Sequence, residues 1–373
     1  ESGAMDTARL RAAFPVLEKT AYLNSGTCGP VPAAAHRAAV EAWRLGTEEG
    51  RSGAFYERLM GLSDQLRERY AALLGAAVED VALTAGTSDG CGRVVAGLAL
   101  GHGDEILTAD DEHPGLQGPL IAARLQRGAT VRAVPLAELP GELRENTKLV
   151  ACSHVSWHSG ALAPVADLAA AARERDIPVL LDGAQSVGAI PVDLGSSGVA
   201  FYAGSGQKWL CGPVGCGMLW IDPAWRERVA SPLVAYRGVA EHDRGLESGL
   251  TDDARRHDLP SQDLPTVAAA VAAYDVLAEA GFAELQATAI AGAARLAQML
   301  ADAGHEVVGR GDSTLVAWAA GGADPDAEAI SVRDRLEEAG VIVRNLPGVG
   351  RLRASVGAYN DAGDLHRLIT GLG

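Results

Sequence analysis

Between Ala21 and about Leu259, short apolar runs rich in β-branched residues alternate with longer segments of helical periodicity, and this alternation constrains the fold most. Seven of the runs predict strands, at Val81–Thr84, Glu105–Ala109, Thr130–Val134, Lys148–His154, Pro178–Asp182, Val199–Ala203 and Cys216–Ile221. Helical patterns lie between several of them, at Ser88–Leu100, Leu116–Gln126 and Val165–Arg175. Apolar strands separated by helices are typical of a mostly parallel sheet with helices on both faces. We therefore predict an α/β fold with a seven-stranded sheet whose ligands lie beyond the carboxyl ends of the strands.

A second pattern begins after a charged, irregular stretch from Trp225 to Asp258. Two long helices are predicted at Leu264–Ala280 and Ala283–Ala303. After them we predict strands at Glu306–Gly309, Thr314–Ala319, Val341–Arg344 and Arg351–Val356, and helices at Asp326–Ala339 and Ala362–Leu372. The chain is accordingly divided into a large domain, residues 21–258, and a smaller α+β domain, residues 259–373. Residues 1–20 form an N-terminal segment expected to pack with the small domain, and its first four residues, before Met5, resemble a cloning remnant.

The overall charge narrows the choice of partners. With 48 acidic and 32 basic residues, the formal net charge is −16, which argues against nucleic acid and anionic membranes as ligands.

The five cysteines are odd in number and form no CxxC pair, and the sequence has neither a signal-like segment nor a membrane-length apolar run. We expect a cytoplasmic protein with reduced thiols and no metal site.

One lysine stands out in this arginine-rich chain. Only three of the 32 basic residues are lysines, and Lys208 follows a predicted strand within the glycine-rich stretch 204–210. An ammonium group can lose its proton near neutral pH and act as a nucleophile, whereas guanidinium cannot. Asp182 ends the apolar run 177–181. A carboxylate at a buried strand end and such a lysine are what a pyridoxal 5′-phosphate (PLP) site requires.

Two further loops follow predicted strands. In the stretch 84–88, Gly86, Thr87 and Ser88 stand at the start of a helix, where free N–H groups and the helix dipole favour a phosphate. The alternative is an ordinary helix cap. His113, before Pro114, stands where an imidazole would lie over a flat cofactor ring, although a surface histidine is an equally good interpretation.

Two residues are candidates for contact with substrate. Trp157 lies in a polar and aromatic stretch, 152–160, that would line the same crevice, or it packs in the core. Arg353 lies on a short predicted strand, where a guanidinium suits two-point capture of a carboxylate. With 29 arginines in the chain, a surface role is a strong alternative for any one of them.

Together these stretches resemble the class V aminotransferase family of PLP enzymes with fold type I. The resemblance runs from 22–25 to 353–357 and is most specific at Asp182-Gly183-Ala184-Gln185-Ser186 and at 204–213. Within the family, the stretches 112–115 and 153–157 resemble the branch of cystine/cysteine C–S lyases and isopenicillin-N-epimerase-like enzymes.

The resemblance implies roles for individual residues. The large domain would bind PLP, with Lys208 holding it covalently, Asp182 contacting the pyridinium nitrogen and His113 lying on the ring. Gln185 would bond to the ring oxygen, while the phosphate would be held by the 86–88 loop with Ser205 and Gln207. Arg353 would bind the substrate α-carboxylate, near Ser25 and Trp157. The family is dimeric with shared sites, so Ser261 would contact the phosphate of the other subunit.

Two departures from the desulfurases of this family bear on the chemistry. Gln207 stands where they commonly have histidine, and residues 310–353 contain no cysteine, although desulfurases place their persulfide-forming cysteine there. We therefore expect β-elimination from cystine, cysteine or an S-substituted cysteine, giving pyruvate, ammonia and a thiol or persulfide. Alternatives are an amino-acid epimerase or racemase, with His113, His154 or His158 as a second acid, an aminotransferase, and a non-catalytic PLP-binding protein. Substrate choice would lie in four loops, 25–30, 48–56, 236–249 and 344–350.

Overall fold

The computed structural model describes residues 7–373, so the stretch that resembles a cloning remnant lies outside the described residues. The predicted strands form one seven-stranded sheet in the order β2-β8-β7-β6-β5-β3-β4. Their bounds are β2 (Val81–Thr84), β3 (Glu105–Ala109), β4 (Thr130–Val134), β5 (Thr147–Ser153), β6 (Val179–Asp182), β7 (Phe201–Ser205) and β8 (Gly217–Ile221). Only β8 runs antiparallel to its neighbours, which confirms the mostly parallel α/β sheet.

Helices cover both faces of this sheet, because successive buried residues of each strand point to opposite sides. On one face, Val179 and Leu181 of β6 pack in a cluster that contains residues of the helices α3, α6 and α8. On the other, Leu180 packs with residues of α4 and α5. The bounds are α2 (Ala33–Glu48), α3 (Gly53–Leu74), α4 (Thr87–Gly97), α5 (Pro114–Ala122), α6 (Val165–Arg173), α7 (Leu194–Ser197) and α8 (Leu264–Ala280). A short π-helix, Ala123–Arg127, continues α5 to Arg127.

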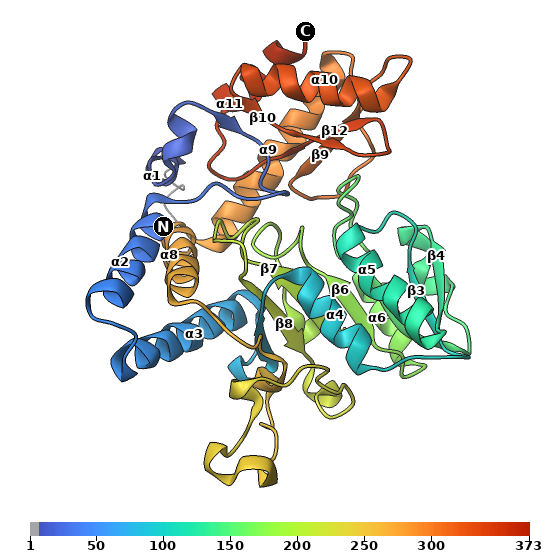
Figure 1. The fold of residues 1–373 in the computed structure, drawn as a ribbon. Helices are drawn as coiled ribbons and strands as arrows, with labels where there is room; N and C mark the ends of the chain where they lie inside the picture. The colour runs from blue at the N-terminus through green and yellow to red at the C-terminus, as the bar shows by residue number, and fades with distance from the viewer. Residues whose placement is uncertain (1–6) are drawn as a thin grey trace.

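The C-terminal unit is a three-stranded antiparallel sheet with helices (Figure 1). Its elements are α9 (Phe282–Asp302), β9 (Leu315–Ala319), α10 (Pro325–Glu338), β10 (Val341–Ile342), β11 (Arg344–Leu346), β12 (Arg351–Ser355) and α11 (Ala362–Leu372). The strand predicted at 306–309 is absent from the described chain except for one bridge between Val307 and Trp318. The strand predicted at 341–344 is divided, since β10 pairs with β1 (Ala21–Tyr22) and β11 pairs with β12.

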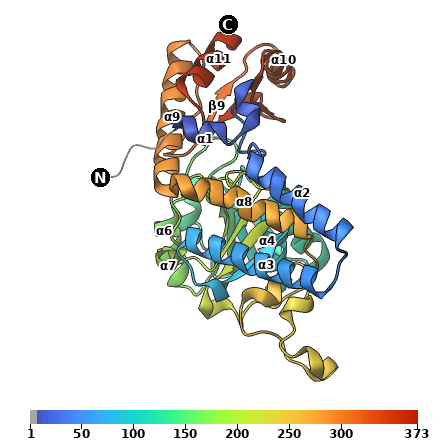
Figure 2. The same cartoon turned by 90° about the vertical axis from the view of Figure 1, so that its left-hand side faces the viewer.

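The helix α8 packs with the large sheet rather than with the C-terminal unit. Its Val267 and Val271 belong to the hydrophobic cluster that covers one face of the sheet. The chain then bends by 80° at Gly281, which has φ +84°, and α9 runs along the C-terminal unit (Figure 2). We propose that the boundary between the two units lies near Gly281 rather than at residue 259.

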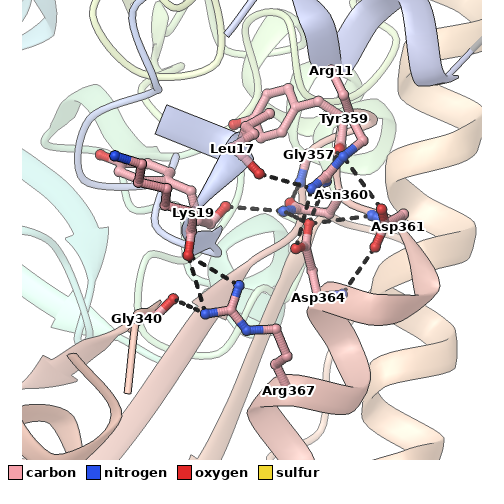
Figure 3. A network of polar contacts seen from close by, with 11 residues as sticks. Arg11, Leu17, Lys19, Gly340, Gly357, Tyr359, Asn360, Asp361, Asp364 and Arg367 are labelled. Carbon is pink, nitrogen blue, oxygen red and sulfur yellow. Dashed lines mark hydrogen bonds and ion pairs between the residues drawn. The ribbon is translucent and has the colours of Figure 1, made fainter. Parts of the chain in front are cut away.

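The N-terminal segment is tied to the C-terminal unit by Arg11 of α1 (Thr7–Ala12). Its guanidinium donates to the Asp364 carboxylate at 2.6 Å and to the Tyr359 carbonyl oxygen at 2.7 Å, and it lies 3.3 Å from the Asp361 carboxylate (Figure 3). Arg367 of α11 donates to the Lys19 carbonyl oxygen at 3.3 Å. Through these contacts residues 7–20 lie against the smaller unit, while Leu10, Phe14 and Leu17 also pack in the hydrophobic cluster of the large unit.

Candidate active site

A cavity of about 330 Å³ opens where β6 and β7 end. Eight residues singled out from the sequence line it, namely Gly86, Thr87, Ser88, His113, Asp182, Ser205, Gln207 and Lys208. Ala85, Asp89 and Ala184 complete the lining. The chain contributes these residues from four separate segments, which follow β2, β3, β6 and β7, and the parallel strands bring them to one edge of the sheet.

One end of the cavity lies at the N-terminus of α4. Gly86 precedes this helix with φ +154°, a conformation that favours glycine, and a Cβ on Gly217 would lie only 2.5 Å from the Gly86 Cα. The Thr87 hydroxyl is 2.6 Å from the Ser205 hydroxyl, and the Oε1 atom of Gln207 is buried with no hydrogen-bond partner in the described part of the chain. Helix N–H groups, two hydroxyls and an amide make this end suitable for a phosphate.

Asp182 and Lys208 occupy the interior of the cavity. Asp182 is the last residue of β6, is 5% exposed, and accepts a hydrogen bond from the Ala184 N–H at 2.9 Å. Burial raises the pKa of its carboxyl, and Lys208 opposes that rise. Burial lowers the pKa of Lys208 to about 8, with Arg353 and Arg344 contributing and Asp182 opposing. The lysine therefore has an appreciable amine fraction near neutral pH.

His113 forms the N-cap of α5, and Pro114 fixes the first turn of that helix. Its Nδ1 accepts a hydrogen bond from the Gly115 N–H at 3.0 Å, which leaves Nε2 to carry the proton of the neutral ring. Burial, together with Lys208, lowers its pKa to about 4. The edge of Trp157 lies against this ring at a centroid distance of 5.1 Å. His113 is thus a neutral, fixed imidazole at neutral pH.

Arg353 lies beside the cavity on β12 and is 1% exposed. One of its nitrogens donates to the Trp157 carbonyl oxygen at 2.7 Å, while Nε and Nη2 have no hydrogen-bond partner among residues 7–373. Burial, and then Arg344 on the paired strand β11, lower its pKa to about 9, so the group stays charged at neutral pH. A buried guanidinium with two unpartnered donors is an anion site.

Besides Arg353 and Trp157, three predicted residues lie outside the cavity lining. Gln185 donates to the Gly26 carbonyl oxygen at 2.8 Å and accepts from the Trp209 indole at 3.2 Å. Ser25 is fully buried and its hydroxyl bonds to that of Tyr359. Ser261 is exposed on the segment before α8 and is not among the residues that line the cavity.

Two structurally important residues were missed by the sequence reasoning. Glu112 is buried and accepts hydrogen bonds from both the N–H and the hydroxyl of Ser153. Asp89 lines the cavity and is neutralised by Arg93 at 3.0 Å. The only sign of Glu112 and Asp89 in the sequence was that an acidic residue stands next to each of the two predicted loops. Of the four loops assigned to substrate choice, the one at 236–249 lies in an arm that projects away from the C-terminal unit (Figure 1).

Residues 7–373 contain no group of three or more His, Cys, Asp or Glu side chains that could hold a metal ion. No single helix in this part of the chain is long and apolar enough to cross a membrane. The helices α8 and α9 pass that test of length and composition only as a pair, bent by 80°.

Comparison with known proteins extends over most of the chain. The family model for class-V aminotransferases matches residues 22–368. A probable cysteine desulfurase of Pseudomonas aeruginosa is 32% identical over 324 residues, 79% of this chain and 77% of the relative. Isopenicillin N epimerase of Streptomyces clavuligerus is 31% identical over 225 residues, 57% of this chain and 56% of that relative. The match to the epimerase therefore spans little more than half of its length.

Solved structures match nearly the whole fold. The cystine C–S lyase C-DES, in complex with its reaction product cysteine persulfide, has a TM-score of 0.90 and 27% identity, covering 96% of this chain and 98% of that one. A C-DES mutant with glycine covalently linked to the PLP cofactor has a TM-score of 0.91 and 26% identity, covering 97% and 98%.

Proposed function

Since the chain belongs to the class-V aminotransferase family, we propose that it is a PLP-dependent carbon–sulfur lyase acting on a sulfur-containing amino acid. The mostly parallel sheet and the smaller α+β unit are the type I fold of PLP enzymes. The proposed reaction is β-elimination from cystine, cysteine or an S-substituted cysteine. The products would be pyruvate, ammonia and a thiol or persulfide.

The residues of the cavity fit PLP. The Gly86–Ser88 loop, Ser205 and Gln207 suit its phosphate, and the unpartnered Oε1 of Gln207 fits this interpretation. Asp182 suits the protonated ring nitrogen, and Lys208 is the amine that would hold the aldehyde carbon. When bound, PLP withdraws electrons from the substrate Cα and so makes its proton acidic.

Lys208 is the residue best suited to move the Cα proton. Its lowered pKa, about 8, leaves the Nζ atom able to accept a proton from Cα and later to give it up. Asp182 lies in an environment that disfavours its own charge, so a cationic ring nitrogen beside it would be stabilised by pairing. His113, neutral and fixed by Gly115, would exclude water from one face without carrying charge.

Two arginines favour a substrate with more than one negative group. Arg353, with its unpartnered Nε and Nη2, suits the α-carboxylate. Arg344 donates to the Thr27 hydroxyl at 3.2 Å, and no carboxylate of residues 7–373 lies within ion-pair distance of it. It is close enough to lower the pKa values of Lys208, His113 and Arg353. Cystine, with two amino-acid ends, matches this pair of cations better than cysteine does.

The observation that carries this proposal is the buried Lys208 in one cavity with Asp182, with an anion site at Arg353 close enough to lower the pKa of Lys208. The test is to incubate the PLP-loaded enzyme with cystine, cysteine and S-substituted cysteines, and to measure pyruvate and the released thiol or persulfide. We expect pyruvate and sulfur product in equal amounts. Spectroscopic evidence of substrate binding without either product would exclude the lyase.

Epimerisation or racemisation is the second candidate, since isopenicillin N epimerases are among the relatives. It requires a second proton donor opposite Lys208. His113 has an Nε2 proton and lines the cavity, whereas His154 is not among the residues that line it and His158 bonds to Arg351 at 3.2 Å. Deuterium incorporation at Cα with loss of configuration and without pyruvate would select this reaction. Formation of pyridoxamine phosphate and a keto acid would instead indicate an aminotransferase.

We also propose a homodimer in which the exposed Ser261 reaches the phosphate of the partner's site. The five free thiols are consistent with a reducing, cytoplasmic environment. Analytical ultracentrifugation tests whether the protein is a dimer. A Ser261→Ala variant that retains PLP as tightly as the parent would exclude the proposed contact.

A further inference from the structure

A second cavity lies at the opposite end of the large sheet. Its volume is about 670 Å³, within the range of small-molecule sites. It is formed where β5 begins, at Thr147 and Lys148, and just before β6, at Ile177 and Pro178. Since β5 has seven residues, roughly 20 Å of strand separates this cavity from the end that faces Asp182. It is therefore independent of the candidate active site.

The cavity is cationic in a strongly acidic protein. Four basic residues line it, Arg144, Lys148, Arg175 and Arg228, against two acidic ones, Glu145 and Asp176. The chain as a whole has a formal net charge of −16. A local excess of positive charge on such a surface attracts anions, since most of the remaining surface repels them.

Two of the cations have no acidic partner in the part of the chain that the structure describes. Lys148 donates only to the Glu145 carbonyl oxygen, at 3.3 Å, and Arg175 only to the Leu143 carbonyl oxygen, at 2.8 Å. Within residues 7–373, no carboxylate lies within ion-pair distance of either side chain. Lys148 is one of only three lysines in the chain. Both charges are thus available to a ligand.

The other two cations have acidic partners. Arg228 pairs with both oxygens of Asp176, at 2.9 and 2.6 Å, and its guanidinium carbon lies 3.6 Å from the centroid of the Trp225 ring. Arg144 lies 3.5 Å from Glu105, a carboxylate that Arg132 already contacts through two nitrogens. These pairs give the cavity a defined wall beside the two unpaired charges.

The remaining lining is apolar and includes an aromatic ring. Leu98, Leu100, Ile177, Pro178 and Trp225 contribute this surface. A ligand that satisfies both parts of the cavity has at least two negative charges and an apolar or aromatic body. We propose that this cavity binds a phosphorylated small molecule of nucleotide size, with its phosphates between Lys148 and Arg175 and its body against the apolar wall.

The test is calorimetric titration of the PLP-loaded enzyme with ADP, pyrophosphate and adenosine. Full loading with PLP keeps the phosphate end of the active site filled. We expect ADP to bind more tightly than pyrophosphate, and adenosine not to bind measurably. Because the attraction is electrostatic, the ADP affinity should fall as salt is raised from about 0.05 to 0.3 M.

The double variant Lys148→Gln/Arg175→Gln should raise the Kd for ADP by about tenfold or more. The matched control is Lys19→Gln, which removes an exposed lysine elsewhere and should leave the Kd unchanged. Thermal unfolding of each variant checks that the fold persists. The proposal is overturned if no probe binds, if adenosine binds as well as ADP, or if the double variant binds ADP like the control.

Discussion

Glu112 accepts two hydrogen bonds from the same residue, one from the Ser153 N–H at 2.7 Å and one from the Ser153 hydroxyl at 2.5 Å. This clamp joins the loop after β3 to the end of β5. His113 is the next residue along that loop, so the clamp positions the imidazole over the cavity. Glu112 is a positioning residue of the candidate site.

The clamp has a predictable pH dependence. Burial raises the pKa of Glu112 from 4.5 to about 8, against the opposing effect of the Ser153 hydrogen bonds. The folded state therefore binds this proton more tightly than the unfolded state does. Its contribution to stability is full below about pH 4.5 and is lost as the pH rises towards and through 8.

Glu112→Gln should make the free energy of unfolding less dependent on pH between about 4.5 and 8. The reason is that the glutamine amide cannot titrate but can still accept a hydrogen bond from Ser153. Urea unfolding of both proteins from pH 5 to 9 measures the effect, and Ser153→Ala tests the clamp from the other side. Parallel profiles for the Glu112→Gln variant and the parent would show that Glu112 does not titrate in this range.

Lys208→Ala should lose covalently held PLP and reduce turnover by about 10² to 10⁴-fold, the range for removal of a positioned base. Borohydride reduction followed by peptide mass analysis locates the labelled lysine. Lys19→Ala is the matched control, because Lys19 is exposed and far along the chain from the cavity residues. Full turnover in the Lys208→Ala variant would exclude all the enzymatic proposals above.

Arg344→Gln should separate two classes of substrate. Without the second cation, the KM for cystine should rise by about tenfold, while the KM for S-methylcysteine changes little. Arg353→Gln should impair both, since both carry an α-carboxylate. Arg228→Gln, which changes an arginine paired with Asp176 at the opposite end of the large sheet, is the control. Equal effects of Arg344→Gln on both substrates would remove the argument for a doubly anionic substrate.

The large sheet could be predicted because the sequence pattern that forms each strand lies within a few neighbouring residues. Each strand is a short apolar run, and residues that end such runs, among them Asp182, must meet at one edge. The small unit was less predictable, since β10 and β11 are too short to carry a pattern and depend on pairing with β1 and β12.

The supporting contacts of the site could not be read from the sequence. The clamp between Glu112 and Ser153 joins residues 41 positions apart. Arg344 has no carboxylate partner among residues 7–373 because the fold brings the Thr27 hydroxyl, rather than an acidic side chain, next to it. Such contacts follow from tertiary packing and leave no periodic trace. The same holds for the position of α8, whose apolar pattern fits either unit.

A buried ion pair in the large unit should be more sensitive to partial removal than to complete removal. Arg67 donates to both oxygens of Asp258, at 3.0 and 2.7 Å, and the two side chains are 3% and 2% exposed. Asp258 also accepts a hydrogen bond from the Leu83 N–H at 2.8 Å, which fixes the end of the projecting arm to β2.

Asp258→Asn leaves the Arg67 charge buried without its counter-ion and should cost about 3–5 kcal/mol of unfolding free energy. The double variant Arg67→Met/Asp258→Asn removes both of these charges and keeps an acceptor for Leu83, so it should cost less than the single variant. Arg237, which lies 3.6 Å from Asp258, keeps its ion pair with Asp64 in both variants. Urea unfolding followed by circular dichroism measures both, and a double variant less stable than the single one would contradict this account.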